Sequence, residues 1–234
     1  QEAPKIEPRP TPIDLRPSAF PGLFGRQNEL QSMTASLQSG QPVELLGEAG
    51  IGKTSLVRDL SYQPFTTVFP HGVIYVSARQ MPFNDLLQFL YDIFYKSAPP
   101  SKPTEAQLQL ALKGRQALVL LDDVEFTQAE LEQLTQVVAP GCTFLWTSQE
   151  RTLWGEGRSI ALRGLPNEEA LRLIEWELQR PLTVEERYDA EKICAALEGH
   201  PLQILQAAAR ASEEGNSLAQ LAQQLQTDET GVEL

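Results

Sequence analysis

The sequence predicts an α/β fold in which a parallel sheet is flanked by helices, followed by a small all-helical domain. Its apolar runs, such as "LVLLDDV", do not alternate with polar residues and are separated by helical patterns, which is typical of strands covered on both faces. A glycine-rich stretch at 47–55, "GEAGIGKTS", joins one apolar run to the start of a helix. After Leu165 the strand patterns stop and only helical patterns follow.

The first 22 residues include six prolines and show no sustained periodicity. They predict an extended linker or strap at 1–22. The α/β domain then occupies 23–165. Within it, the patterns predict helices at 26–38, 53–61, 83–95, 104–114 and 127–138, and strands at 42–46, 72–78, 117–124, 142–148 and 159–165.

The predicted all-helical domain, a lid on the α/β domain, covers 166–227 and leaves 228–234 as a tail. Asn167 and Thr183 are predicted N-caps, because acidic residues follow each of them in the first helical turn. The helical patterns lie at 167–179, 183–199, 201–214 and 217–226.

The composition limits the classes of partner. The 234 residues carry a net charge of −12, and from Leu165 onward 5 basic and 14 acidic residues contribute −9 of it. This charge would repel a phosphate backbone, so general binding to nucleic acid or to an anionic membrane is disfavoured, although a local basic patch is compatible with the total. No apolar run is long enough to span a membrane and no secretory signal opens the sequence. The two cysteines lack metal-ligand spacing, so we expect them to be buried thiols in a cytoplasmic protein. We also expect the sequence to be a piece of a longer chain.

The glycine-rich stretch, from here on the glycine loop, fits the pattern G-x-x-x-x-G-K-[ST]. Glycines let successive backbone N–H groups point inward around an anion, and the following helix adds its positive end. Lys53 would reach the β- and γ-phosphates of a nucleotide, and the Thr54 hydroxyl would bind Mg²⁺. A tight strand–helix turn with an incidental lysine is the alternative. The predicted cofactor-binding residues are Gly47, Glu48, Ala49, Gly50, Ile51, Gly52, Lys53, Thr54 and Ser55.

Two aspartates end the apolar run "LVLLDDV". We expect Asp122 to hold the Mg²⁺ shell through water and Asp123 to orient or deprotonate the attacking water, so both are predicted catalytic residues. Without the glycine loop, the two acids would fit a helix N-cap equally well. At the end of the next run, Thr147, Ser148 and Arg151 are candidate sensors of a terminal phosphate, and a solvated turn fits them nearly as well.

Four motifs follow one another in order: "LFGRQNE" at 23–29, the glycine loop, the acidic run, and "GHPL" at 199–202. Together they resemble the nucleotide-binding core of the STAND class of signal-transduction ATPases, which includes the NB-ARC proteins. The resemblance spans roughly residues 20–225. Its first and last motifs carry the specificity, because many ATPase classes share the two in the middle.

The resemblance implies an adenine nucleotide, ATP or ADP, bound with Mg²⁺. It also implies that Pro201 lies against the nucleotide. The family commonly has an arginine where this sequence has Gln149, which predicts weak sensing of the γ-phosphate unless Arg151 takes over that role. Three further residues are implied to help enclose the base: Phe24, Gly25 and Arg26.

These observations predict a slow Mg²⁺-dependent ATPase that acts as a nucleotide-operated switch in signal transduction. The expected partners are an adenine nucleotide and flanking effector and sensor domains, and the resemblance adds a homo-oligomer. An AAA+ type ATPase acting on nucleic acid is one alternative, which the acidic charge disfavours. A nucleotide-bound scaffold with negligible turnover is another, which Gln149 favours.

Overall fold

The computed structural model describes residues 5–98, 102–213 and 217–230, and the chain divides into two compact units. The first unit contains the chain up to Pro21, Asn28–Leu46 and Thr54–Ala161. The second contains Gly22–Gln27, Gly47–Lys53 and the chain from Leu162 onward. Most of the glycine loop therefore groups with the C-terminal helices rather than with the sheet.

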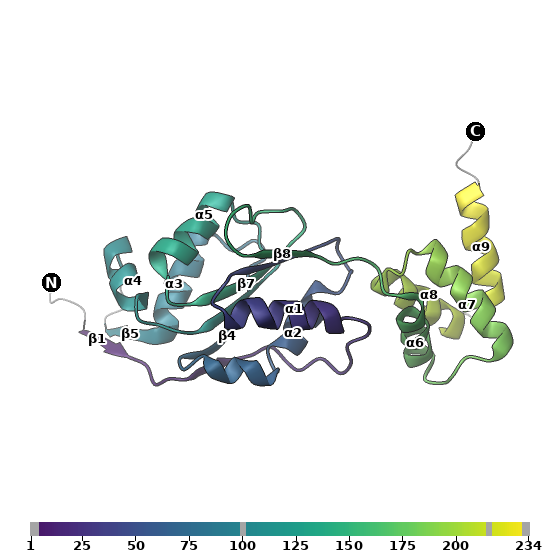
Figure 1. Ribbon diagram of the computed structural model, residues 1–234, viewed down its shortest axis with the longest axis horizontal. Coiled ribbons are helices and arrows are strands. Elements are labelled where there is room, and N and C mark those ends of the chain that lie inside the picture. Colours follow the sequence, from purple (N-terminus) through teal and green to yellow (C-terminus); the bar gives the residue numbers. More distant parts are fainter. Residues whose placement is uncertain (1–4, 99–101, 214–216, 231–234) are drawn as a thin grey trace. The chain divides into compact units, whose positions relative to one another are not determined.

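The first unit is built on a six-stranded sheet whose paired strands are all parallel, in the order β2-β4-β6-β7-β3-β8 (Figure 1). This confirms the predicted fold class. Since connections between parallel strands cross over in one hand, the carboxyl ends of the strands, and the loops that follow them, share one edge of the sheet. The strands are β2 (Ile13–Leu15), β3 (Val43–Leu46), β4 (Gly72–Ser77), β6 (Leu118–Asp122), β7 (Thr143–Ser148) and β8 (Arg158–Ala161).

Helices cover both faces of this sheet: α3, α4 and α5 lie on one face, and α1 and α2 on the other (Figure 1). The apolar side chains of α3, such as Leu86, Leu90 and Phe94, are buried in one core with residues of β4, β6 and β7. The helical segments are α1 (Gln27–Gln38), α2 (Lys53–Leu60), a 3₁₀ turn (Pro64–Val68), α3 (Phe83–Phe94), α4 (Glu105–Leu112), α5 (Gln128–Glu132) and a π-helical segment (Gln133–Val138).

A second, two-stranded sheet was not predicted. The helix expected to run to residue 95 ends at Phe94, and β5 (Tyr95–Ala98) follows it directly. β5 pairs antiparallel with β1 (Lys5–Pro8) from the proline-rich N-terminal segment. The stretch "SAPPSKP" at 97–103, which separates the helices predicted at 83–95 and 104–114, lies partly outside the described residues, which resume at Lys102.

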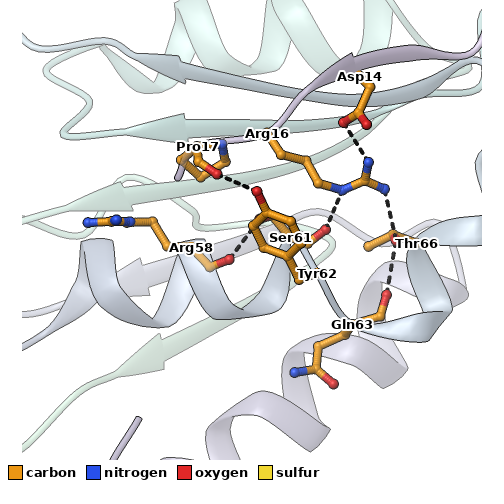
Figure 2. Close-up of polar contacts among 8 residues, drawn as sticks. All are labelled: Asp14, Arg16, Pro17, Arg58, Ser61, Tyr62, Gln63 and Thr66. Atoms are coloured by element: carbon orange, nitrogen blue, oxygen red, sulfur yellow. Dashed lines mark hydrogen bonds and ion pairs between the residues drawn. The ribbon is translucent and has the colours of Figure 1, made fainter. Parts of the chain in front are cut away.

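The rest of the N-terminal segment, residues 13–20, is here called the strap; it begins with edge strand β2 and continues along the end of α2 (Figure 2). Arg16 donates hydrogen bonds to the Ser61 carbonyl at 2.7 Å and to the Thr66 hydroxyl at 3.3 Å. The Tyr62 hydroxyl donates to the Pro17 carbonyl at 2.8 Å. The side chain of Arg58 donates to the carbonyls of Ser18 and Ala19. The strap therefore holds the helix that carries the lysine and threonine of the glycine loop.

Replacing Arg16 with alanine should lower the free energy of unfolding by about 1–2 kcal/mol, because it removes the hydrogen bonds of a partly buried guanidinium to Ser61 and Thr66 and its ion pair with Asp14. Urea unfolding followed by circular dichroism measures the change. Arg9→Ala is the matched control, since the Arg9 side chain is exposed, and it should change stability by less than about 0.5 kcal/mol. Equal changes in the free energy of unfolding for the two substitutions would show that the contacts of Arg16 in the strap do not stabilise the fold.

The second unit is mainly helical and has its own apolar core, which includes Leu171, Ile193 and Ile204. Thr183 caps α7 as predicted, in a reciprocal capping box with Glu186. The N-cap prediction for Asn167 was wrong, because Pro166 occupies the cap position and the helix begins at Asn167 itself. The helices are α6 (Asn167–Leu178), α7 (Val184–Ala196), α8 (Pro201–Glu213) and α9 (Leu218–Thr230).

The last helix is longer than the sequence pattern predicted. α9 runs to Thr230, past the residue 226 at which the apolar spacing ends, and residues 231–234 of the expected tail lie outside the described part of the chain. The final residue of the helix predicted at 201–214 lies outside it as well. None of the helices in the described ranges has both the length and the apolar character needed to span a membrane.

Candidate functional site

The glycine loop leaves β3 at its carboxyl end and merges into α2 at Lys53. Gly50 and Gly52 have φ angles of +82° and +101°, which residues with side chains rarely adopt. The Lys53 ammonium donates hydrogen bonds to the carbonyl of Gly47 and, at 2.9 Å, to that of Glu48. The loop therefore curls around its lysine, which places a positive charge among backbone polar groups.

The segment 22–27 lies against the glycine loop within the second unit. Arg26, almost fully buried, donates to the Ile51 carbonyl at 3.1 Å and to the Arg163 carbonyl at 2.7 Å. Phe24 makes an edge-to-face contact with Trp176 of α6, with ring centroids 6.4 Å apart. Of the three residues implied to enclose a base, Arg26 thus contacts the loop backbone, and Phe24 packs in the helical core.

The "GHPL" motif also reaches the glycine loop. His200, which is buried, lies with its Nε2 atom 3.1 Å from the Ala49 carbonyl oxygen. A Cβ atom on Gly50 would come within 2.7 Å of Leu202 and 2.9 Å of His200. Pro201 begins α8 between these two residues and is half-buried. The structure therefore connects the last motif to the loop through the neighbours of Pro201.

In the first unit, three hydroxyl groups surround Asp122, the buried last residue of β6. Its carboxylate accepts hydrogen bonds from Thr54 at 2.8 Å, Tyr75 at 2.9 Å and Thr147 at 2.7 Å. Burial, and then the negative charge and hydrogen bond of Asp122, raise the pKa of Tyr75, so its phenol stays protonated and donates. The two predicted metal ligands, Thr54 and Asp122, are thus in direct contact, and Ser55 follows in α2 as a half-buried residue.

These residues suit a magnesium ion that is shared with phosphates. Hydroxyl and carboxylate oxygens are ligands that Mg²⁺ prefers, and it usually binds through one or two carboxylates, several waters and the phosphates of a nucleotide. In the described residues, no group of three or more His, Cys, Asp and Glu side chains could hold a metal ion by itself. Thr54 and Asp122 would supply the few protein ligands of a magnesium ion whose other ligands are waters and phosphates.

Asp123 has a different environment from Asp122. Its φ angle is +61°, a left-handed conformation that aspartate and asparagine tolerate better than most residues. Its backbone N–H donates to the Thr147 hydroxyl at 2.7 Å. Its carboxylate pairs with Arg79 at 3.6 Å, and both side chains are substantially exposed. Asp123 is therefore held by its backbone, while its carboxylate remains open to solvent.

The three candidate sensors do not converge on one point. The Thr147 hydroxyl belongs to the cluster around Asp122. The Ser148 hydroxyl donates instead to Glu44, at 3.2 Å. Arg151 is exposed and donates to the Leu153 carbonyl at 3.1 Å, and its guanidinium lies 4.5 Å from the centre of the Trp154 ring. Only Thr147 is thus placed beside a predicted catalytic residue.

Glu44 is a fully buried carboxylate in the middle of β3. It accepts hydrogen bonds from Ser148, from both the backbone N–H and the hydroxyl of Thr152, and from Ser159. Burial by itself would raise the pKa of this carboxyl group, but the hydrogen bonds from Thr152 and Ser159 outweigh burial and lower the pKa below its ordinary value of 4.5. Glu44 therefore stays charged and joins β3, the end of β7, the β7–β8 loop and β8.

Replacing Glu44 with glutamine should lower the free energy of unfolding at neutral pH by about 2–4 kcal/mol, because the amide leaves buried donors without an acceptor. The wild-type contribution is complete above the ordinary pKa of 4.5 and is lost as the pH falls through the lower folded pKa. Urea titrations between about pH 3 and pH 7 should therefore show a steeper loss for wild type than for Glu44→Gln. Glu125→Gln, at an exposed position, should keep the wild-type pH profile.

Sequence reasoning missed four residues around this site: Glu44, Tyr75, Arg79 and His200. A single charge inside the apolar run "PVELL" was a signal for Glu44, because a charged residue is seldom buried without partners. His200 stands inside the motif "GHPL", for which the resemblance implied a contact between Pro201 and the nucleotide. Nothing in the local sequence indicates that Tyr75 or Arg79 contacts an aspartate.

The glycine loop with its lysine, and the hydrogen-bonded pair Thr54–Asp122, lie in a region that matches a known protein family. The NACHT domain matches residues 41–179, which is more than half of the chain. The chain belongs to the NACHT family. The matched region contains the glycine loop, both aspartates and α6, so the protein is a P-loop NTPase domain. The motifs at 23–29 and 199–202 lie outside the part that matches NACHT.

Solved structures resemble the NACHT protein in fold. A Walker-type ATPase of Pyrococcus abyssi is 13% identical, with a TM-score of 0.59 over 88% of this chain and 73% of that chain. The RuvB Holliday junction branch migration motor of Thermotoga maritima is 12% identical, with a TM-score of 0.54 over 90% of this chain and 71% of that chain. At these identities the likeness concerns the fold alone. A comparison with curated proteins found no match.

Proposed function

We propose that this NACHT protein is a nucleotide-operated switch that binds ATP or ADP with Mg²⁺ and hydrolyses ATP slowly. The observation that carries the proposal is the hydrogen bond between Thr54, which follows the loop lysine, and Asp122 at the end of β6. Mg²⁺ bound at these oxygens would neutralise phosphate charge. Lys53 would hold the β- and γ-phosphates, and Asp123 would orient or deprotonate the attacking water.

The switch would act through the loop itself. Phosphates that bind Lys53 compete for the ammonium with the loop carbonyls it now contacts, so nucleotide binding would reshape the loop. Arg26 and His200 contact that same loop, and they would pass the change to the segments that carry them. The resemblance to the STAND class and its NB-ARC proteins supports this role, with flanking effector and sensor domains, a homo-oligomer and a cytoplasmic location as further proposals.

The first experiment is to denature the purified protein gently and identify any released nucleotide by ion-exchange chromatography. ADP at one equivalent would support a resting switch whose nucleotide exchange is regulated. Titration calorimetry with ATP and ADP, each with and without Mg²⁺, then tests binding directly. A protein that releases no nucleotide and takes up neither one with Mg²⁺ would refute the proposal.

A nucleotide-bound scaffold with negligible turnover is a second candidate. The observation that favours it is the placement of the sensor candidates: Ser148 is bound to Glu44, and the Arg151 guanidinium stacks on Trp154. Neither is beside Asp122, and Gln149 carries no charge for a terminal phosphate. Steady-state release of phosphate distinguishes the two candidates, since a scaffold binds nucleotide without measurable turnover. The acidic charge gives no support to action on nucleic acid.

A further inference from the structure

His200 makes two hydrogen bonds that together define the state of its ring. Its Nδ1 atom accepts a hydrogen bond from the backbone N–H of Gln203 at 3.4 Å, in the first turn of α8. A backbone N–H can only donate, so Nδ1 carries no proton in this arrangement. In the neutral ring the proton is then on Nε2, which donates to the Ala49 carbonyl at 3.1 Å. One imidazole thus caps α8 and binds the glycine loop.

The backbone around His200 leaves little room for movement. Gly199 has a φ angle of +71°, and a Cβ atom there would lie 2.4 Å from the Leu165 carbonyl oxygen. The Gly199 carbonyl accepts a hydrogen bond from the Leu165 N–H at 2.8 Å. On the other side, Gly50 leaves no space for a side chain between itself, His200 and Leu202. His200 is therefore held at a fixed place against the loop.

The hydrogen bond from His200 to the Ala49 carbonyl also determines the direction of the Gly50 N–H group. The Ala49 carbonyl and the Gly50 N–H belong to one peptide unit, and in a planar trans peptide they point in opposite directions. A donor on the carbonyl side therefore turns the Gly50 N–H away from His200. Backbone N–H groups of such a loop are the donors that hold phosphate oxygens.

We propose that His200 is a positioning residue for nucleotide phosphates, acting through the Ala49–Gly50 peptide. It fixes the N–H of Gly50 in the direction that phosphate binding needs, and it does so from the start of α8. This inference rests on the proposed nucleotide binding. It assigns to the histidine of "GHPL" a role separate from that of Pro201.

Two substitutions separate the two hydrogen bonds of His200. Asparagine places an acceptor near the position of Nδ1, so His200→Asn keeps the helix cap and loses the reach to Ala49. Glutamine places an amide donor near the position of Nε2, so His200→Gln keeps the bond to the loop and loses the cap. His71→Asn is the control, because His71 lies before β4 and is the other histidine of the chain.

Titration calorimetry with MgADP and thermal unfolding should separate the variants. We expect His200→Asn to bind MgADP about 10-fold more weakly, a change of the size of one hydrogen bond, and to melt no lower than His200→Gln, since each variant loses one hydrogen bond of the buried ring. His200→Gln should restore affinity and melt at a lower temperature, and His71→Asn should bind like wild type. Wild type that binds no MgADP would refute the proposed function. If wild type binds MgADP, two outcomes would overturn the inference about His200 and leave the proposed function standing. One is a His200→Asn variant with the affinity of wild type, and the other is an equal loss of affinity in both His200 variants.

A measurement on the wild-type protein tests the inference without any substitution. With two histidines in the chain, the ring ¹⁵N resonances can be assigned by comparison with His71→Asn. We expect His200 to show the tautomer protonated on Nε2, with that proton protected from solvent exchange and shifted when MgADP binds. A proton on Nδ1, or an Nε2 resonance that does not respond to MgADP, would overturn the inference.

Discussion

Replacing Lys53 with alanine should weaken the binding of ATP and ADP by about 100-fold or more. A hydrogen bond to a charged group contributes about 1.5–3 kcal/mol, and each 1.4 kcal/mol changes affinity about tenfold. Lys53 would meet two phosphates, and its removal also takes away the cation around which the loop curls. Titration calorimetry with MgATP and MgADP measures the loss.

The control for this substitution is Lys113→Ala, at an exposed position just after α4. It removes the same charge from the protein without touching the glycine loop, so it should bind both nucleotides like wild type. Circular dichroism should show a folded protein for both variants. Unchanged affinity in Lys53→Ala would mean that the glycine loop is only a turn between β3 and α2.

The sheet and the pair Thr54–Asp122 could be predicted from the sequence because the information is local. Apolar runs without alternation indicate buried parallel strands, and the glycine pattern places Thr54 at the start of a helix. In a parallel sheet the carboxyl ends of the strands share one edge, which brings the end of β6 to the end of β3. These rules place Thr54 and Asp122 at one edge of the sheet, and their direct contact at 2.8 Å also depends on the strand order, in which only β7 separates β6 from β3.

The network around Glu44 could not be predicted in the same way. Its partners Ser148, Thr152 and Ser159 lie 104 to 115 residues away in the sequence. They meet Glu44 only because β3 pairs with both β7 and β8, in a particular register. A shift of one residue in either register would turn each side chain to the other face of the sheet.

The strands and contacts of the N-terminal segment, which includes the strap, could not be predicted for a different reason. β2 has three residues and β1 has four, which is too short for alternation to stand out, and six prolines favour an extended chain with or without a sheet. Its attachment depends on single contacts to distant residues, such as those of Arg16 with Ser61 and Thr66. Nothing in the local sequence specifies these partners.

Replacing Asp123 with asparagine should leave MgATP affinity within about twofold of wild type and reduce ATP turnover by about 100- to 1000-fold. The reduction is the one expected when a general base is removed from the transition state. The fold should tolerate the change, because asparagine also adopts the left-handed conformation at φ +61° and keeps the backbone N–H that binds Thr147. Losing the exposed ion pair with Arg79 should cost less than about 1 kcal/mol.

Two further variants decide which aspartate has which role. Arg79→Ala removes the same ion pair but keeps the Asp123 carboxylate, so its turnover should stay above that of Asp123→Asn at similar stability. Asp122→Asn should lose the Mg²⁺ dependence of ATP binding itself, because its carboxylate is the one in contact with Thr54. If Asp123→Asn loses ATP binding and turnover equally, the assignment of Asp123 to the attacking water is wrong. The carboxylate would then act on the bound nucleotide or its metal, in the role that the geometry gives to Asp122.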